Sequence, residues 1–502
     1  MSKIKKQKLL LFVSCVLGLA VTFIVLFVSE KQLCMGVPFM PAEKLECYER
    51  VDSFDVTQLL LNGEPVALDS EHNIVYIHQA ESNLSHFSDL KGHLKLTDPA
   101  WSLFFLDSSP ANLSAAIREG TPLYLVAVKG NQCYPISVVL TTLPVIHITG
   151  MPTHVNEDGR NVMSGKLAVW STAENSRYST QTSLVQWHVR GRSTAGEPKN
   201  SWKLSLKQDN GDSNDLDLLN MGADDDWILN GLTMDDTRIK EKLFIDLWNS
   251  MAAGTDYNYK MSCGEYAEVI INNRYMGIYL LQRRIDAKYL QLSDDDVLLK
   301  GITYSAKSAR EAYRFVTPEN NTTLVYSIMQ GTFTRTDCSS LHLRNLIDTN
   351  LMIQLVNARD NCGVLNMYHL LKFNGDEYVQ YLIPWDTDQS FGIIWKSGVG
   401  FCYDMELSLE ELGKRVESES VAALYPQYDS LVRQRWQELR TNLFSQESLL
   451  NRVTSLNIPL VNSGALQRDI SLWGMRYHGV DSIDNLKEYI LKRLDILDRI
   501  YG

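Results

Sequence analysis

The hydrophobic pattern changes its period partway along the chain, and this change constrains the fold more than any other feature. Between residues 54 and 281, short alternating or β-branched runs are separated by turn residues, which is typical of strands. From about Asp337 onward, apolar residues recur three and four positions apart, which predicts helices. One strand pair, Asn366 to Phe373 and Tyr378 to Pro384, interrupts the helical part. The pattern therefore predicts an α+β fold with a β-rich lobe and a helical lobe.

Several individual elements can be predicted from the same patterns. A tight hairpin is expected from Tyr266 to Leu281, turning at Asn272, Asn273 and Arg274, because alternating runs flank these turn residues. Further strands are predicted at Asn73 to His78, Leu123 to Val128, Ile136 to Ile148, Gln186 to Arg190 and Trp202 to Leu206. Helices are predicted at Thr237 to Met251, Leu341 to Asn357, Gln427 to Phe444, Ser448 to Leu456 and Ile483 to Ile500.

These elements divide the chain into four predicted parts. Residues 1–33 are predicted to be a cytoplasmic tail and a membrane anchor, and residues 34–150 a small β-sandwich module. Residues 151–300 form the β-rich lobe and residues 301–502 the helical lobe. The β-sandwich module shows no grouping of ionisable residues that suggests chemistry, so a spacer or docking role is favoured for it.

The first segment has the pattern of a membrane span. Four lysines, at positions 3, 5, 6 and 8, precede an uncharged, mostly apolar run from Leu9 to Val28. As a helix rising about 1.5 Å per residue, this run matches a bilayer core of ~30 Å. The basic end predicts a single-pass protein of the cell membrane whose main part lies outside the cytoplasm. A cleaved signal peptide is the alternative.

The charge balance argues against one class of partner. The chain has 60 acidic and 48 basic side chains, which gives a formal net charge of −12. A protein that binds nucleic-acid phosphates carries positive charge on its binding face. No nucleic-acid partner is therefore expected.

A glycine-containing turn precedes a strand that carries the candidate Lys203. Gly191 and Gly196 have the spacing of a phosphate-binding loop, but Glu197 and Pro198 replace the Lys and Ser or Thr of that motif, so a Walker loop is rejected. Alternation along the following strand places Lys203 opposite the apolar side chains. Lys203 could therefore reach into a cleft, although an ordinary solvated lysine fits the same pattern.

Acidic and amide residues flank the predicted strand pair of the helical part. Asp360 and Asn366 precede it, and Asp386 and Asp388 follow it. The hairpin would bring these side chains to the same end of the strand pair. Their donor atoms are all oxygens, which suit Mg²⁺ or Mn²⁺ carrying a nucleotide. A second acidic run, residues 224–226, is better explained as a charged turn than as a cation site.

Four motifs in a fixed order resemble the spore coat protein H (CotH) kinase family. They are Arg190-Gly-Arg-Ser through Pro198-Lys-Asn-Ser-Trp-Lys-Leu, Asp225-Asp-Trp-Ile-Leu-Asn-Gly, Glu268-Val-Ile-Ile-Asn-Asn-Arg-Tyr-Met-Gly-Ile-Tyr-Leu-Leu, and Pro384-Trp-Asp-Thr-Asp-Gln-Ser-Phe-Gly. The likeness extends over about residues 150–500. It implies an atypical protein-kinase-like fold that uses ATP and Mg²⁺ or Mn²⁺ to phosphorylate Ser, with Thr as a second acceptor, in surface or coat proteins.

The resemblance also implies roles for individual residues. Lys203 would hold the nucleotide phosphates, with Lys199 as the alternate, and Asp360 would orient and deprotonate the acceptor hydroxyl. The remaining carried-over residues are Arg192 and Ser193 for the nucleotide, Asn366 and Asp386 for the metal, and Asp388 as a second metal ligand or as an orienter of the strand end.

One departure from the family pattern raises an alternative function. Many members have a Glu after the Tyr-Leu-Leu strand, where this chain has Gln282, Arg283 and Arg284. If Arg283 lay beside Lys203, its charge would push the lysine away from the phosphates. The alternative is therefore a catalytically inactive surface protein that keeps the CotH fold to bind a partner or to serve a structural role.

Overall fold

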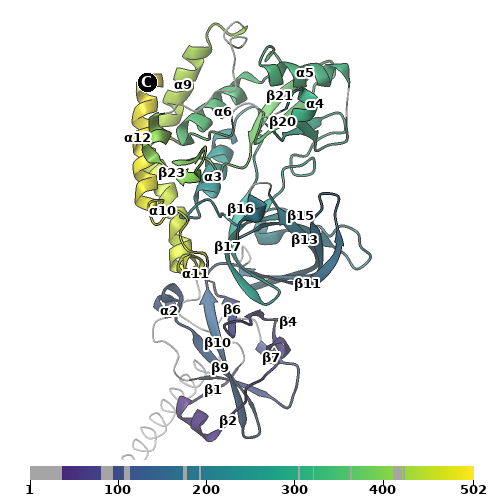
Figure 1. Ribbon diagram of the computed structural model, residues 1–502, viewed down its shortest axis with the longest axis vertical. Helices are drawn as coiled ribbons and strands as arrows, with labels where there is room; N and C mark the ends of the chain where they lie inside the picture. The colour runs from purple at the N-terminus through teal and green to yellow at the C-terminus, as the bar shows by residue number, and fades with distance from the viewer. Residues whose placement is uncertain are drawn as a thin grey trace, which may run out of the picture.

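The chain folds into a β-sheet module, a β-barrel and a helical part (Figure 1). The computed structural model describes residues 37–80, 94–106, 113–172, 178–191, 194–303, 306–319, 322–361, 364–410, 421 and 424–502. Across these ranges, no helix is both long and apolar enough to cross a membrane. The apolar run from Leu9 to Val28, which carries the anchor prediction, lies outside the described residues.

The N-terminal module consists of two sheets packed around a common core. The larger sheet has seven strands in the order β1-β8-β9-β10-β6-β5, with β2 paired to β10, and the smaller has the order β4-β3-β7. Helix α2 (Leu113–Glu119) contributes Leu113 and Ile117 to the core. The strands are β1 (Phe39–Met40), β2 (Glu49–Arg50), β3 (Leu59–Leu61), β4 (Glu64–Pro65), β5 (Ala67–Asp69), β6 (Ile74–His78), β7 (Leu94–Leu96), β8 (Ser102–Leu106), β9 (Leu123–Lys129) and β10 (Gln132–Thr141).

One predicted strand is in fact two strands in different sheets. The run Ile136 to Ile148 is divided between β10, in the N-terminal module, and β11 (Val145–Val155), in the barrel. Pro144 lies between them and has no backbone N–H to donate to a sheet. The prediction of one continuous strand was wrong because an apolar run does not show which sheet each half joins.

The barrel is closed by seven strands in the order β11-β12-β13-β14-β15-β17-β16. Its interior is filled by large side chains, including Trp187, Trp227 and Tyr279, which are fully buried. The predicted hairpin is confirmed: Asn272 and Asn273 have φ of 49° and 60°, as a tight turn between two strands requires. The remaining barrel strands are β12 (Asn161–Thr172), β13 (Tyr178–Arg190), β14 (Ser201–Lys207), β15 (Asp226–Asn230), β16 (Gly264–Ile271) and β17 (Arg274–Arg283).

The helical part surrounds a four-stranded sheet of order β19-β18-β20-β21. The predicted strand pair is confirmed as β20 (Met367–Phe373) and β21 (Tyr378–Pro384). Two further strands, β18 (Val297–Gly301) and β19 (Tyr313–Phe315), were not predicted, because they are too short to show a period. A separate hairpin is formed by β22 (Ile393–Lys396) and β23 (Gly400–Tyr403).

The predicted helices are present, and one of them joins the two lobes. Helix α3 (Lys240–Ala252) lies between β15 and β16 in sequence, yet Leu243, Phe244 and Trp248 pack in the core of the helical part. The β-rich and helical lobes are therefore built around a shared element. The other helices are α4 (Ala309–Ala312), α5 (Thr323–Thr334), α6 (Leu343–Val356), α7 (Met405–Glu410), α9 (Tyr428–Arg440), α10 (Gln446–Asn462), α11 (Ala465–Trp473) and α12 (Ile483–Tyr501).

Candidate functional site

The β20–β21 pair brings Asn366 and Asp386 together, as the sequence predicts. Asn366 ends the chain segment before β20, and Asp386 follows β21. The Asn366 side-chain amide donates to the Asp386 carbonyl at 3.2 Å, and the Trp385 N–H donates to the Asn366 carbonyl at 2.9 Å. Asn366 and Asp386 have φ of 53° and 57°. A left-handed conformation costs energy outside glycine, and such residues cluster at functional sites.

Asp360 is held against the same loop by a glutamine that sequence analysis did not single out. It lies just beyond α6, and its carboxylate accepts a hydrogen bond from the Gln389 side-chain amide. The Gln389 carbonyl also accepts from the Arg359 N–H at 3.1 Å. Next to Asp360, the buried Asn361 amide donates to the carbonyls of Asn366 and Trp385, each at 2.8 Å. The loops before and after the strand pair are thus joined by side-chain hydrogen bonds.

A further carboxylate, Glu241 of α3, reaches this loop from the other direction. Glu241 accepts hydrogen bonds from Thr387 Oγ1 at 2.7 Å and from the Thr387 N–H at 3.3 Å. Burial, reinforced by the charge of Asp386, raises the pKa of Glu241. Burial also raises the pKa of Asp388 well above its ordinary value, with contributions from Asp386, Glu241 and Asp360. Four carboxyl groups therefore share one region; we call Glu241, Asp360, Asp386 and Asp388 the acidic group.

Glu241 could not be found from the sequence. It lies between Lys240 and Lys242, a run of charges typical of a solvated helix face. In the fold it is buried, because the α3 helix is enclosed by the barrel and the helical part. Only the packing of α3 distinguishes this carboxylate from a surface one.

Two cations from different lobes meet over Trp385, beside the acidic group. The Arg190 guanidinium, at the end of β13, lies 5.5 Å from the centre of the Trp385 ring, and Lys300 Nζ, in β18, lies 5.3 Å from it. Burial and the charge of Arg190 lower the pKa of Lys300 to about 8, whereas Asp386 acts to raise it. Neither cation was among the predicted site residues: Arg190 opens one of the four motifs but was given no role there, and Lys300 lies outside all of them.

Lys203 has an acidic partner, Asp226, at the start of β15, the strand that begins at the end of the acidic run 224–226. Lys203 Nζ lies 3.0 Å from Asp226 Oδ2, and Arg284 Nη1 lies 2.8 Å from the same atom. Burial acts to raise the pKa of Asp226, but the charge of Lys203, with Ser205 and Arg284, holds it below its ordinary value. Arg284 in turn contributes to the lowered pKa of Lys300, so this cluster is electrostatically connected to the cations beside the acidic group.

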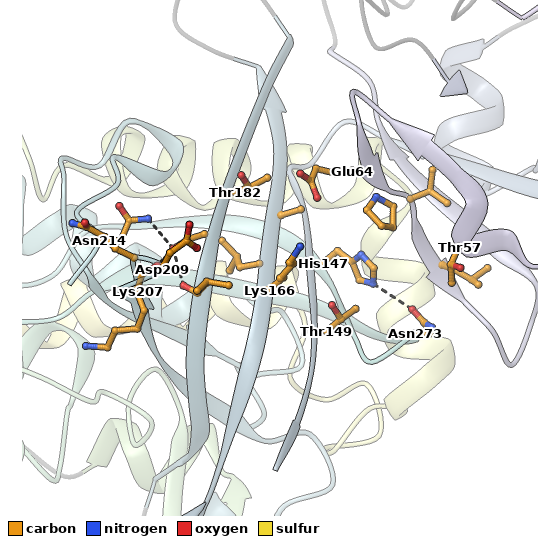
Figure 2. A pocket seen from close by; sticks show the side chains of 18 of the residues that line it. Thr57, Glu64, His147, Thr149, Lys166, Thr182, Lys207, Asp209, Asn214 and Asn273 are labelled. Carbon is orange, nitrogen blue, oxygen red and sulfur yellow. Dashed lines mark hydrogen bonds between the residues drawn. The ribbon is translucent and has the colours of Figure 1, made fainter. Parts of the chain in front are cut away.

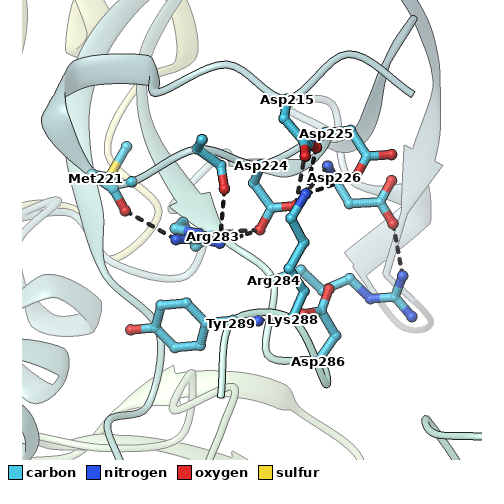
Figure 3. Close-up of polar contacts among 12 residues, drawn as sticks. Asp215, Met221, Asp224, Asp225, Asp226, Arg283, Arg284, Asp286, Lys288 and Tyr289 are labelled. Carbon is cyan, nitrogen blue, oxygen red and sulfur yellow. Dashed lines mark hydrogen bonds and ion pairs between the residues drawn. The ribbon is translucent and has the colours of Figure 1, made fainter. Parts of the chain in front are cut away.

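The expectation that Arg283 could lie beside Lys203 was wrong. In the barrel register Lys203 pairs with Ile228, which pairs with Gln282, so Gln282 shares the face of Lys203. Successive strand residues point to opposite faces, and Arg283 therefore points away from it. Figure 3 shows Arg283 directed at Asp224, with Nη2 2.5 Å from Oδ2. Arg284 is the arginine that approaches Lys203, through their shared carboxylate.

The acidic run 224–226 is neutralised by neighbouring cations. In the described part of the chain, one group of three carboxylates has oxygens mutually within 4.8 Å, and it consists of Asp215, Asp224 and Asp225. Lys288 points into this group and forms ion pairs with all three, at 3.7 Å to Asp224 and 3.6 Å to Asp225 (Figure 3). An ammonium thus occupies the position that a metal would need, which supports the charged-turn interpretation.

Lys199 lies in a buried ion-pair cluster rather than in the open site region. Its Nζ is 2.5 Å from Asp469 Oδ1 in α11, and Arg238 Nε is 2.8 Å from Asp469 Oδ2. The Ile278 N–H also donates to Asp469 at 2.9 Å. A nucleotide phosphate could reach Lys199 only by displacing Asp469. The geometry thus favours Lys203 as the accessible lysine; Arg192 and Ser193 lie outside the described residues.

We expect Asp469→Ala to lower the free energy of unfolding by about 3–5 kcal/mol, because it removes the carboxylate that pairs with two buried cations, Lys199 and Arg238. Chemical denaturation of the purified chain, followed by tryptophan fluorescence, measures this change. Asp495→Ala, at an exposed position on α12, is the control and should stay within about 0.5 kcal/mol of the parent. Equal destabilisation by both variants would contradict the structural role of Asp469.

One cavity lies away from the acidic group. A cavity of about 750 Å³ lies between the N-terminal module and the outer face of the barrel. Figure 2 shows side chains of the N-terminal module, Thr57 and Glu64, near those of the barrel strands, among them His147, Lys166 and Thr182. None of the predicted site residues lines it. The cavity is a mixed polar surface, and the candidate chemistry is elsewhere.

A β-rich lobe, a helical lobe and opposed acidic and basic groups at their junction define a kinase-like domain of the α+β class. Residues 187–497 match the family model described as CotH kinase protein, and the chain belongs to this family. No curated protein matches the chain. The matched range begins within β13 and ends within α12, so it contains all the predicted site residues and Glu241, Lys300 and Arg284. The sequence-based resemblance is confirmed; family membership suggests a kinase and implies ATP.

Proposed function

We propose that this chain is an ATP-dependent protein serine kinase of the CotH type, acting on Ser, with Thr as a second acceptor, in surface or coat proteins. The observation that carries the proposal is the acidic group, which faces Arg190 and Lys300 where the two lobes meet. Phosphoryl transfer needs alignment and charge neutralisation more than a strong base. Opposed acids and cations in one region provide both.

Asn366 and two members of the acidic group, Asp386 and Asp388, offer donors that fit a hard divalent cation. Asp386 and Asp388 offer carboxylate oxygens, and Asn366 offers its side-chain oxygen because its nitrogen already donates to the Asp386 carbonyl. Oxygen ligands of this kind suit Mg²⁺ or Mn²⁺. Burial and neighbouring carboxylates raise the pKa values of Asp388 and Glu241, and a bound cation would favour their ionised forms. Asn366, Asp386 and Asp388 would hold the cation, which supplies neutralisation of phosphate charge.

The remaining residues bind and orient the reactants. Lys203, kept in place by Asp226, would contact the ATP phosphates. Asp360, held by Gln389, would accept the proton of the Ser hydroxyl as the oxygen forms a bond to the γ-phosphorus. The bond between the γ-phosphorus and its bridging oxygen breaks, and ADP leaves. The transferred group ends as a phosphoserine.

The alternative is an inactive CotH-fold protein that binds a partner or has a structural role. The pairing of Arg283 with Asp224 supports the kinase, since it removes the cation that would have displaced Lys203. The test is incubation of the purified chain with labelled ATP, Mg²⁺ or Mn²⁺, and Ser-containing acceptor proteins. Metal-dependent labelling of Ser is expected. Absence of labelling with every cation and acceptor would favour the alternative.

We expect Glu241→Gln to weaken metal-dependent ATP binding about tenfold without lowering the melting temperature. The amide can still accept from Thr387, but the negative charge that helps to hold a cation is lost, and so is repulsion with Asp386. Titration of ATP at several Mg²⁺ concentrations measures the first effect and thermal unfolding without metal the second. Glu265→Gln, at an exposed position in β16, is the control. A fall in both affinity and stability would indicate a purely structural role.

We also propose that residues 1–33 anchor the protein in the cell membrane, with the lobes outside the cytoplasm. The length of the run from Leu9 to Val28 and the preceding lysines support this topology. Protease added to intact cells should digest the chain beyond Ser29 and leave a product with the original N-terminus. Mature protein that begins near residue 30 would instead establish a cleaved signal peptide.

A further inference from the structure

The short β22–β23 hairpin follows the acidic group and carries apolar side chains into solvent. Trp395 in β22 is 52% exposed, and Val399 in the connecting turn is 70% exposed. Phe401 pairs directly with Trp395 in the register and is half-buried. A partner could bury the half of the Trp395 indole that is exposed to water. Apolar side chains that group together on a surface often mark an interaction site.

The base of the hairpin is fixed to the core. Ile393 and Ile394 are buried, and the Asp404 N–H donates to the Gly392 carbonyl at 2.8 Å. Lys396, at the turn end of β22, forms an ion pair with Asp404, which directly follows β23. The base of the hairpin is therefore packed against the core, while Trp395 and Val399 point outward into solvent.

Gln389 connects this hairpin to Asp360. Its side-chain oxygen accepts a hydrogen bond from the Trp395 N–H at 2.9 Å, and its side-chain nitrogen donates to the Asp360 carboxylate. One amide group thus joins the backbone of Trp395 to the carboxylate. Two hydrogen bonds and one amide group separate the Trp395 backbone nitrogen from the Asp360 carboxylate. An extended polypeptide advances about 3.3 Å per residue, so roughly two or three of its residues would cover the distance between these two groups.

We propose that the β22–β23 hairpin is the docking surface for the acceptor polypeptide, with Trp395 contacting an apolar side chain near the acceptor Ser. The inference rests on the proposed kinase function, because it assumes that the acceptor hydroxyl approaches Asp360. A chain whose hydroxyl lies at Asp360 has its neighbouring residues beside the hairpin. Gln389 is the positioning residue that keeps the docking surface and Asp360 in register.

The test uses the full chain and Ser peptides that carry Leu at each position within three residues of the Ser, each with a matched peptide carrying Asp there. We expect Trp395→Ala to raise KM about tenfold for the best Leu peptide, because a buried aromatic contact is lost. The kcat and the KM for ATP should stay within about twofold, and Trp395→Phe should restore most of the affinity. The Asp counterpart should be affected little.

A matched pair of valines provides the control for surface polarity. Val399→Ser should raise KM for the Leu peptide, whereas Val155→Ser, at the 60% exposed end of β11, should not. If the parent transfers phosphate but Trp395→Ala leaves the preference for Leu over Asp unchanged, the docking inference is wrong and the kinase proposal stands. A Trp395-dependent dimer with unchanged peptide KM would likewise overturn it.

Failure of the kinase proposal would be recognised separately. If the parent chain transfers no phosphate to any peptide, binding of the fluorescent Leu peptide is followed by anisotropy in the presence of ADP and Mg²⁺. Binding that is lost in Trp395→Ala supports the hairpin as a docking surface on a non-catalytic protein. Equal binding by both chains, or no binding by either, overturns the inference.

Discussion

Asp360→Asn is expected to lower kcat for phosphate transfer to Ser by about 10²–10⁴-fold, while ATP and metal binding change little. Asn cannot take the proton of the acceptor hydroxyl, but it keeps the size of the side chain and can still accept from Gln389. The loop that contains Asp386 should therefore keep its position. Single-turnover transfer and equilibrium binding of ATP, measured on the same preparations, separate the two effects.

The control for this substitution is Asp376→Asn in the exposed β20–β21 turn, which should leave kcat unchanged. A drop in transfer confined to Asp360→Asn supports Asp360 as the base. Parent and variant that are equally inactive on every acceptor point to the inactive binding protein. Equal, high activity in both would remove Asp360 from the mechanism and leave the kinase proposal intact.

Asp386→Ala is expected to abolish metal-dependent ATP binding, with at least a hundredfold loss of affinity in the presence of Mg²⁺ or Mn²⁺. The Asp386 backbone carbonyl accepts a hydrogen bond from the Asn366 side-chain amide. The pKa values of Glu241 and Asp388, already raised by burial, are raised further by the charge of the Asp386 carboxylate. Removing this carboxylate takes away a negative charge that acts on both Glu241 and Asp388 in the acidic group. Calorimetric titration of ATP with and without each cation measures the effect.

A second variant separates this loss of charge from a backbone effect. Asp386 has φ of 57°, a conformation that Asn adopts more readily than Ala. Asp386→Asn should thus preserve the loop and still lose metal-dependent binding. Asp376→Ala in the β20–β21 turn is the neutral control. Metal-dependent affinity unchanged in Asp386→Asn would exclude Asp386 as a ligand.

Part of the site was predictable because its members are close in sequence or joined by a local hairpin. Asn366 and Asp386 flank two strands of regular alternation, and pairing those strands necessarily brings their ends together. The position of Asp360 followed from the same reasoning, although its hydrogen bond from Gln389 did not. The catalytic role of Asp360 and the metal-binding roles of Asn366 and Asp386 are predictions, and the Asp360 and Asp386 variants test two of them.

The rest of the site depends on contacts between distant segments. Arg190 and Lys300 meet over Trp385, and Glu241 reaches Thr387 from a helix that precedes it by more than a hundred positions. The error over Arg283 has the same origin. Its neighbour in space depends on strand register, and a change of one residue reverses the face to which a side chain points.

The amino-acid sequence by itself determined the family, the α+β class, the predicted helices and the two hairpins around Asn272 and between β20 and β21. These features depend on local periodicity, turn residues and ordered motifs, which are written along the chain. The tertiary structure decided which charges are buried, which partners they have and which faces meet. In the folded chain, Lys203 forms an ion pair with Asp226, Lys199 with Asp469, and Arg283 with Asp224. The physical reason is that an ion pair is a contact in space between groups whose separation in sequence carries no information about their distance.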